Sequence, residues 1–360
     1  MNIQNKFVIQ LIILSLLWSL VMLTPIFYID EVVTRSDKVM DISMHLSRIE
    51  NISLIPIDYE GVDTRGYYGP LFHILIGYPS YIMGIRGRFL LSIGVSFMCF
   101  FALPYSVYYL AKTYFKSVEA GICAGLCYLV GTHNNVMYIF TSTYSQGLNQ
   151  LIILFMLSFM IKEIRDNKNI RWSFVFCFLG VLSHSTGAVY SISLFICYLF
   201  LRKKYLIIGL LGSCVAWSVV FFPVIWSRFK GYSTRLIDSG VSIVLIKNMT
   251  FEKLSWLNPL IMFPAIMQIK EDFKKQSTEF ILLLFAFVIP ILSSPICPFM
   301  RPLLNVSALG CVLGSKIILK HFNEDFRSSA IIIIICAFFV SYLLAGNLAM
   351  VHLNVWGTIN

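Results

Sequence analysis

The chain has 360 residues, of which 58% are hydrophobic and only 13% are charged, and its mean hydropathy is +0.79. Soluble domains are about half apolar and a quarter charged, so this composition excludes an ordinary soluble protein. The net charge is +10, but the basic residues are dispersed in short loops and form no stripe of the kind that binds nucleic acid. The sequence therefore predicts an all-α, polytopic integral membrane protein whose surroundings are membrane lipids and not nucleic acid.

The nine cysteines do not indicate a disulfide framework. Eight of them lie inside apolar runs, where cysteine is ordinarily a small packing residue, and only Cys297 lies in a predicted loop. Cys123 and Cys127 are one helical turn apart, but no histidine or carboxylate flanks them. We therefore predict no metal site at these cysteines.

The first apolar run, from Phe7 to Tyr28, is long enough to span a bilayer. No small-residue cleavage site follows it, so we expect a retained first helix and not a signal peptide. The longest polar stretch, 30–70, comes next. The apolar run 71–84 is too short to span upright, which favours a helix in the membrane interface. Further spans are expected at 89–111, 120–139, 147–161, 172–184, 186–201, 205–226, 257–269, 280–294, 303–319 and 329–351.

Together with the first helix, these segments predict about 11 crossings. The apolar run 172–201 is too long for one helix, and the polar sequence from Ser183 to Gly187 predicts a break between two short helices. No repeat or separate soluble domain is visible. We therefore expect the chain 1–360 to form a single multispanning membrane domain.

The distribution of basic residues predicts the orientation in the membrane. When the N-terminus is placed in the cytoplasm, most Lys and Arg residues fall into cytoplasmic loops, among them Lys112, Lys168 and Lys204. The loop 30–70, called here the first outer loop, then lies on the non-cytoplasmic side.

The first outer loop contains eight carboxylates, most of which are expected of any solvated loop. Three side chains, Asp41, His45 and Arg48, stand at positions i, i+4 and i+7, so a helix would place them on one face. Leu46 and Ile49 give the same segment an apolar side, as in a helix lying on the membrane. A carboxylate can take a proton from an attacking hydroxyl, and a guanidinium can bind phosphate oxygens. The pattern predicts either a plain surface helix or a site for a phosphorylated, lipid-linked substrate.

The order of these features resembles the GT-C superfamily, multispanning glycosyltransferases that use polyprenyl-linked sugar donors and that include O-antigen polymerase-like proteins. The resemblance begins with a first helix that ends in an acidic loop, the D-x3-H-x2-R helix, and Tyr68-Gly69-Pro70-Leu71 before a short apolar helix. It continues in GIRGRFLLSIG, in LAKTYFKSVEAG, in the broken segment 172–201 and in SSPICPFMRPLLNVSALG. The resemblance implies a GT-C-like helical fold with the active site in the first outer loop.

The resemblance further implies a catalytic acid in this loop. Asp41 is favoured because His45 and Arg48 accompany it, and the pair Asp30 and Glu31, directly after the first helix, is the alternative. The sequence shows no dedicated metal cluster, although the oxygens of Asp30, Glu31 and Asp41 could ligate a divalent cation as cofactor. The residues expected to bind the donor are His45, Arg48, Tyr68, Arg88, His184, Arg228, Arg235 and Arg301, the last in a rigid outer turn between Pro298 and Pro302.

A weaker expectation concerns the third outer turn, where His133, Tyr144 and Gln146 are candidates to line a sugar site. An ordinary interfacial loop is the alternative for each of them.

The function implied is that of a glycosyltransferase in cell-surface polysaccharide biosynthesis. It would lie in the bacterial inner membrane and act on the periplasmic face, with an undecaprenyl-linked sugar or oligosaccharide as donor. A repeat-unit polymerase for the O-antigen of lipopolysaccharide is the first interpretation. The alternatives are a transferase that moves a single sugar from a polyprenyl phosphate, and a flippase for a lipid-linked glycan. Other polysaccharide-assembly proteins are candidate partners.

Overall fold

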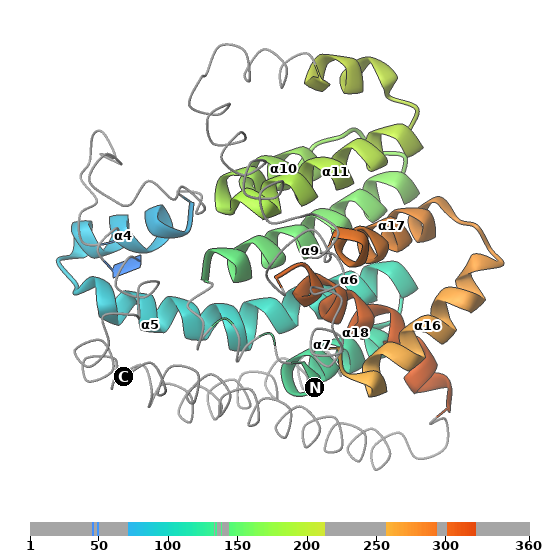
Figure 1. Cartoon of the computed structure of the whole chain (residues 1–360), viewed down its shortest axis with the longest axis horizontal. Coiled ribbons are helices and arrows are strands. Elements are labelled where there is room, and N and C mark those ends of the chain that lie inside the picture. The colour runs from blue at the N-terminus through green and yellow to red at the C-terminus, as the bar shows by residue number, and fades with distance from the viewer. Residues whose placement is uncertain are drawn as a thin grey trace, which may run out of the picture.

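A computed structural model of the protein describes residues 45, 46, 49, 71–132, 134, 138, 144–212, 257–293 and 301–321, apart from a few side chains within these ranges. Over these residues the chain is nearly all helical (Figure 1). The elements, in chain order, are α4 Leu71–Met83, α5 Gly87–Phe97, the π-helical turn η1 Met98–Ala102, α6 Leu103–Phe115, α7 Val118–Gly131, α9 Tyr144–Arg165, α10 Trp172–Ser183, α11 Ser185–Leu201, α16 Pro259–Phe273, α17 Thr278–Ser293 and α18 Arg301–His321.

Three of the described helices are long and apolar enough to cross a membrane, namely Phe89–Phe115, Tyr144–Arg165 and Leu303–Lys320. Shorter apolar helices accompany them, including α4, α7, α10, α11 and α17. This composition is that of an integral membrane protein. The predicted count of about 11 crossings stays a prediction, since the expected first and last spans, 7–28 and 329–351, lie outside the described residues.

The longest of the described helices runs without a break from α5 through η1 into α6. Its π-helical segment lies just before a proline. Pro104 in the first turn of α6 has no N–H to donate back to the preceding turn, and its ring crowds the carbonyl four residues earlier. The wide π turn, Met98–Ala102, lies directly before it and accommodates the interruption without ending the helix. The span Phe89–Phe115 has 27 residues, about 40 Å at 1.5 Å per residue, which exceeds the hydrocarbon thickness. α4 lies beside the α5 end of this helix (Figure 1).

The expected span 120–139 is wrong at its end, because α7 stops at Gly131 and Thr132 is extended. Side chains satisfy the carbonyls that this early end leaves open. The Thr132 hydroxyl donates to the Tyr128 carbonyl at 2.8 Å, and the Asn258 amide donates to the Gly131 carbonyl at 3.0 Å. The expected single helix is therefore interrupted at Thr132.

The predicted break within 172–201 is confirmed. α10 ends at Ser183, His184 is extended, and α11 begins at Ser185. The Asn149 amide of α9 holds this junction by donating to the Ser183 hydroxyl at 2.7 Å and to the Gly180 carbonyl at 3.2 Å. A side chain from a neighbouring helix thus replaces the hydrogen bonds that the break removes from the backbone.

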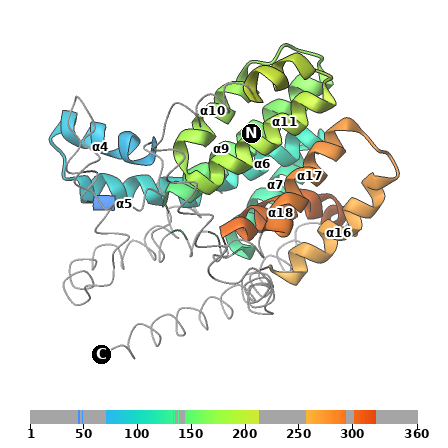
Figure 2. The same cartoon turned by 45° about the horizontal axis from the view of Figure 1, so that its top comes forward.

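Packing places α9 and α18 in the middle of the described bundle (Figures 1 and 2). α18 contacts α16, α7 and α17, while α9 contacts α6, α10 and α11. Gly314 lets α16 and α18 approach closely, since a Cβ there would lie 3.1 Å from the Ile261 carbonyl oxygen. Small residues are typical of such contacts between membrane helices, where dispersion and not water release drives association.

The basic loops meet at one end of the bundle, called here the basic end. Arg165, at the end of α9, donates to the Thr113 and Tyr114 carbonyls at the end of α6, at 2.7 and 3.2 Å, and lies 3.6 Å from Glu279 of α17. The Tyr114 hydroxyl donates to Asp272 of α16 at 2.9 Å. These contacts gather loops that the sequence assigned to one side of the membrane. Which side this is stays a prediction.

Surface ion pairs also lie at the basic end. The Lys168 ammonium, 2.8 Å from Asp166, holds the pKa of that carboxyl below its usual value. The Lys320 ammonium, 3.0 Å from Glu271, lowers the pKa of that carboxyl in the same way. Exposed pairs of this kind contribute little to stability.

Candidate functional site

Buried polar side chains gather at the end of the bundle opposite to the basic end, called here the polar end. It is formed by the first turns of α9, the last turn of α7, the junction of α10 and α11, and the start of α18, with α4 nearby. The first two turns of α9, Tyr144-Ser-Gln-Gly-Leu-Asn-Gln150, are unusually polar for the start of an apolar helix. Their polar side chains are all buried. Ionisable or polar groups in such a position mark sites in membrane proteins more often than in soluble ones.

A cluster of four rings, here the imidazole cluster, joins the first outer loop to this end. His45 Nδ1 lies 2.8 Å from His73 Nε2 of α4, and both side chains are buried. The ring of His45 also lies 5.3 Å from that of Tyr144 and 5.7 Å from that of Phe72, measured between centroids. In a direct contact between two ring nitrogens one donates and the other accepts, so one of the two imidazoles keeps an unprotonated nitrogen. The cluster can therefore hold or pass on a proton.

The second group of polar residues, around Gln150, is fully engaged by the protein. Its Oε1 accepts from the Tyr128 and Tyr138 hydroxyls at 2.7 and 2.9 Å and from the Asn134 amide at 3.2 Å. Its Nε2 donates to the Leu304 carbonyl of α18 at 2.7 Å. This network ties α7, α9 and α18 together, and its saturation gives it a structural role.

Two side chains in the first turn of α9 differ from Gln150, because each has a buried oxygen that accepts no hydrogen bond from the described residues. Ser145 Oγ and Gln146 Oε1 are buried, and neither has a hydrogen-bond partner in the part of the chain that the structure describes. The expectation that Tyr144 and Gln146 lie in an outer turn is wrong. They belong to the helix itself and face its neighbours.

The predicted site residues fall into three groups. His45 and His184 are described, are buried, and lie around the first two turns of α9, His45 against Tyr144 and His184 next to the Ser183 that binds Asn149. Arg88 lies in the first turn of α5 and Arg301 is the first residue of α18, where the backbone alone is described. The third group lies outside the described residues and consists of Asp30, Glu31, Asp41, Arg48, Tyr68, Arg228 and Arg235.

Arg301 had been expected in a rigid turn, and the structure corrects this because α18 begins with Arg301-Pro302. Proline is well suited to the first turn of a helix, since its missing N–H has no partner there in any case. Arg301 remains at the polar end, one turn before the Leu304 carbonyl that Gln150 and Asn134 bind. Although Arg301 lies in a helix and not in a turn, its backbone is thus at the same end of the bundle as the first turns of α9.

Sequence reasoning missed His73, Asn149 and the network around Gln150. The signal was available in part, since each is a polar residue inside an apolar helix, where burial requires a partner. The pairing of His45 with His73, which are 28 residues apart, could not be read from spacing within one helix.

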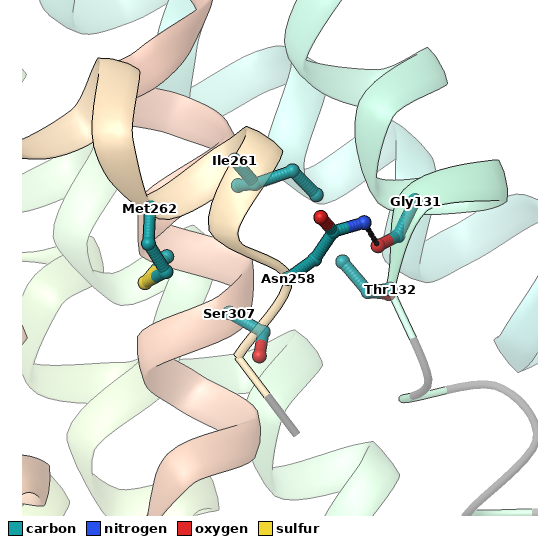
Figure 3. A pocket seen from close by; sticks show the side chains of 6 residues that line it. All are labelled: Gly131, Thr132, Asn258, Ile261, Met262 and Ser307. Atoms are coloured by element: carbon teal, nitrogen blue, oxygen red, sulfur yellow. Dashed lines mark hydrogen bonds between the residues drawn. The ribbon is translucent and has the colours of Figure 1, made fainter. Parts of the chain in front are cut away.

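A separate crevice is lined by Gly131, Thr132, Asn258, Ile261, Met262 and Ser307 (Figure 3). It has no room for a water-sized molecule, and the Asn258 amide crosses it to the Gly131 carbonyl. We regard it as a packing gap. Within the described residues there is also no group of three or more His, Cys, Asp or Glu side chains that could hold a metal ion. The three acids proposed as cation ligands lie outside those residues.

The fold and the polar end define an integral membrane protein of bundled helices with buried imidazole and amide groups at one end. No protein-family model matches the chain, and no curated protein matches it. Among solved structures, it is similar to the crystal structure of the Archaeoglobus fulgidus oligosaccharyltransferase in complex with Zn and sulfate. The TM-score is 0.50 at 16% sequence identity, and the match covers 77% of this chain and 44% of that one.

The likeness at this low identity concerns the fold alone. The expected helical membrane fold is confirmed over the described residues, and the assignment to the GT-C superfamily stays a prediction. The chain spans less than half the length of the enzyme it resembles.

Proposed function

We propose that the protein is a membrane glycosyltransferase of the GT-C type that takes its sugar from a lipid-linked donor. The observation that carries this proposal is the arrangement of helices shared with an oligosaccharyltransferase over 77% of the chain. The position of His45 supports it, because a residue of the acidic first outer loop lies buried against α4 and α9 at the polar end. A catalytic acid in that loop would then work beside the buried polar groups.

The proposed chemistry follows from the types of residue at this end. Asp41, four residues before His45 in the sequence, is the general base that takes the proton of the acceptor hydroxyl. The released carrier phosphate needs positive charge to stabilise it, which Arg48 and Arg301 would supply. Asp30 and Glu31 remain the alternative acids, and oxygens of all three could bind a divalent cation.

Within this class, we propose a repeat-unit polymerase that lengthens an undecaprenyl-linked glycan in the bacterial inner membrane, on the periplasmic face. The polar end opposite to the basic loops supports this orientation. The alternatives are transfer of single sugars from a polyprenyl phosphate and transport of a lipid-linked glycan.

The length distribution of the surface polysaccharide in a deletion strain separates these activities. A polymerase predicts that the ladder of chain lengths is lost while one repeat unit is retained. A full ladder that lacks one branch sugar would indicate the single-sugar transferase. Loss of all surface glycan, with the lipid-linked unit accumulating on the cytoplasmic side, would indicate a transporter.

The catalytic assignment is tested in the same strain by complementation. Asp41→Asn keeps the size of the side chain but removes the base, so transfer should fall by roughly 10²-fold or more. Arg301→Lys keeps the charge but loses the planar fork, so donor use should weaken without being abolished. Asp30→Asn is the matched control. Should Asp30→Asn abolish transfer while Asp41→Asn leaves it intact, the acid is Asp30 and not Asp41.

A further inference from the structure

The start of α9 carries two layers of polar side chains, one helical turn apart. Asn149 and Gln150 form the deeper layer, and Ser145 and Gln146 stand four residues before them, about 6 Å nearer to the start of the helix. Because residues at i and i+4 share a helix face, Ser145 lies above Asn149 and Gln146 above Gln150.

The deeper layer is used by the protein itself. Asn149 binds the Ser183 hydroxyl and the Gly180 carbonyl, and Gln150 binds two hydroxyls, an amide and a backbone carbonyl. In the deeper layer, hydroxyl, amide and carbonyl groups of neighbouring helices thus provide the hydrogen bonds of both buried amides.

The outer layer is not used in this way. Residue Ser145 is 0% exposed and residue Gln146 is 6% exposed, yet Ser145 Oγ and Gln146 Oε1 have no hydrogen-bond partner among the described residues. A buried acceptor without a partner is unfavourable and uncommon. In Ser145 and Gln146 two such acceptors are adjacent and lie at the end of the bundle that carries the imidazole cluster, where a ligand at the proposed site can supply the missing donors.

The outer layer also faces the proposed site. Side chains on a helix lean toward its N-terminus, so Ser145 and Gln146 lean toward the end of the bundle. Tyr144, the residue before them, packs its ring on His45 of the imidazole cluster. The unused acceptors therefore lie beside the segment that carries the proposed catalytic acid.

We propose that Ser145 and Gln146 bind the hydroxyl groups of a sugar, and this rests on the proposed glycosyltransferase function. A carbonyl oxygen such as Gln146 Oε1 requires a donor, which sugar hydroxyls and N-acetyl groups provide and which the oxygens of a phosphodiester do not. Ser145 can both donate and accept, as a sugar hydroxyl does. The pair thus determines which sugar is accepted, while the arginines bind the carrier phosphate.

The test uses Gln146→Leu, with Gln268→Leu as its matched control. Gln268 in α16 is also fully buried, and neither of its amide atoms has a partner in the described part of the chain. Leucine is similar in size, and in both cases it removes a buried amide oxygen that has no hydrogen-bond partner among the described residues. Each variant should therefore unfold at the same temperature as the wild type or at a higher one. Glycan transfer should fall at least tenfold in Gln146→Leu and stay unchanged in Gln268→Leu.

Binding is measured directly on the full chain in lipid nanodiscs. The probes are farnesyl diphosphates that carry glucose, galactose or N-acetylglucosamine, and farnesyl diphosphate without a sugar. At least one sugar-bearing probe should raise the unfolding temperature of the wild type and of Gln268→Leu more than the sugar-free probe does. In Gln146→Leu this extra rise should be lost, while the rise caused by the sugar-free probe is kept.

Two outcomes would overturn the inference, and only the second would also overturn the proposed glycosyltransferase function. An equal sugar-dependent rise in wild type and Gln146→Leu, with equal transfer, means that water alone fills this layer, and it leaves the glycosyltransferase proposal standing. If no probe raises the unfolding temperature of the wild type, and the deletion strain keeps its glycan, both proposals fail together.

Discussion

Glu163 shows how a single buried acid can organise one end of this bundle. Its Oε1 accepts the backbone N–H groups of Arg171, Trp172 and Ser173 at the start of α10, at 3.0 to 3.3 Å. Its Oε2 accepts the Ser173 and Tyr198 hydroxyls at 2.5 and 2.7 Å. The carboxylate thus satisfies the open N–H groups of α10 from a neighbouring helix, and the dipole of α10 favours its charge.

Replacing Glu163 by glutamine should therefore be costly. The amide offers one acceptor oxygen in place of two and turns its own N–H groups toward donors. We expect a loss of about 1.5–3 kcal/mol in the free energy of unfolding, measured from thermal unfolding of the purified protein in detergent. Glu119→Gln, which changes an exposed acid bonded to Ser117, should change it by less than about 0.5 kcal/mol. Equal effects of the two changes would contradict this role for Glu163.

At the residue scale, the sequence identified types of side chain better than their partners. His45 was singled out by its spacing from Asp41, and it is indeed buried and in contact. Its partner His73 lies in another element, and spacing within a helix says nothing about contacts between helices. In the sequence, Glu163 is one of several charges at the end of an apolar run, and the backbone groups that it binds carry no sequence signal.

The junction of α10 and α11 depends on close packing against α9. A Cβ at Gly187 would lie 2.2 Å from the side-chain Cγ of Asn149 and 2.3 Å from both of its polar atoms. Since Asn149 binds Ser183 and Gly180, a larger residue at position 187 would displace the amide that holds the break.

Gly187→Ala should lower the free energy of unfolding by about 1–3 kcal/mol. Gly209→Ala is the control, because nothing lies within 4 Å of a Cβ there, and alanine should be neutral or stabilise the helix by about 0.5–1 kcal/mol. Thermal unfolding of both variants in the same detergent is the measurement. A Gly187→Ala protein as stable as the wild type would show that Asn149 does not hold the junction.

At the element scale, the break at Ser183–Gly187 was predictable because polar and small residues interrupt an apolar run. The end of α7 at Gly131 was not, since the Asn258 side chain that binds its last carbonyl comes from 127 residues further along the chain. The start of α9 at Tyr144 was placed three residues too late. Its first residues are polar, and hydropathy alone discounts polar residues even where a helix buries them.

At the scale of the molecule, the described residues form a bundle with a basic end and a polar end. Its orientation in the membrane can be tested by labelling. Cysteines introduced at Asp58 and Ser239 should react with a membrane-impermeant maleimide in intact cells. A cysteine at Lys168, whose side chain is 70% exposed at the basic end, should react only after the membrane is permeabilised. Labelling of position 168 in intact cells, or of positions 58 and 239 from opposite faces, would contradict the proposed topology.

The most direct measurement is the fate of a lipid-linked donor given to the purified protein in proteoliposomes. The donor is a polyprenyl diphosphate that carries a labelled oligosaccharide repeat, and a second copy of the repeat serves as acceptor. We predict that the wild type releases polyprenyl diphosphate and lengthens the glycan, and that Asp41→Asn does so roughly 10²-fold more slowly. A wild-type protein that leaves every donor intact, or that moves the donor across the bilayer without breaking its glycosidic bond, would contradict the central claim of glycosyl transfer.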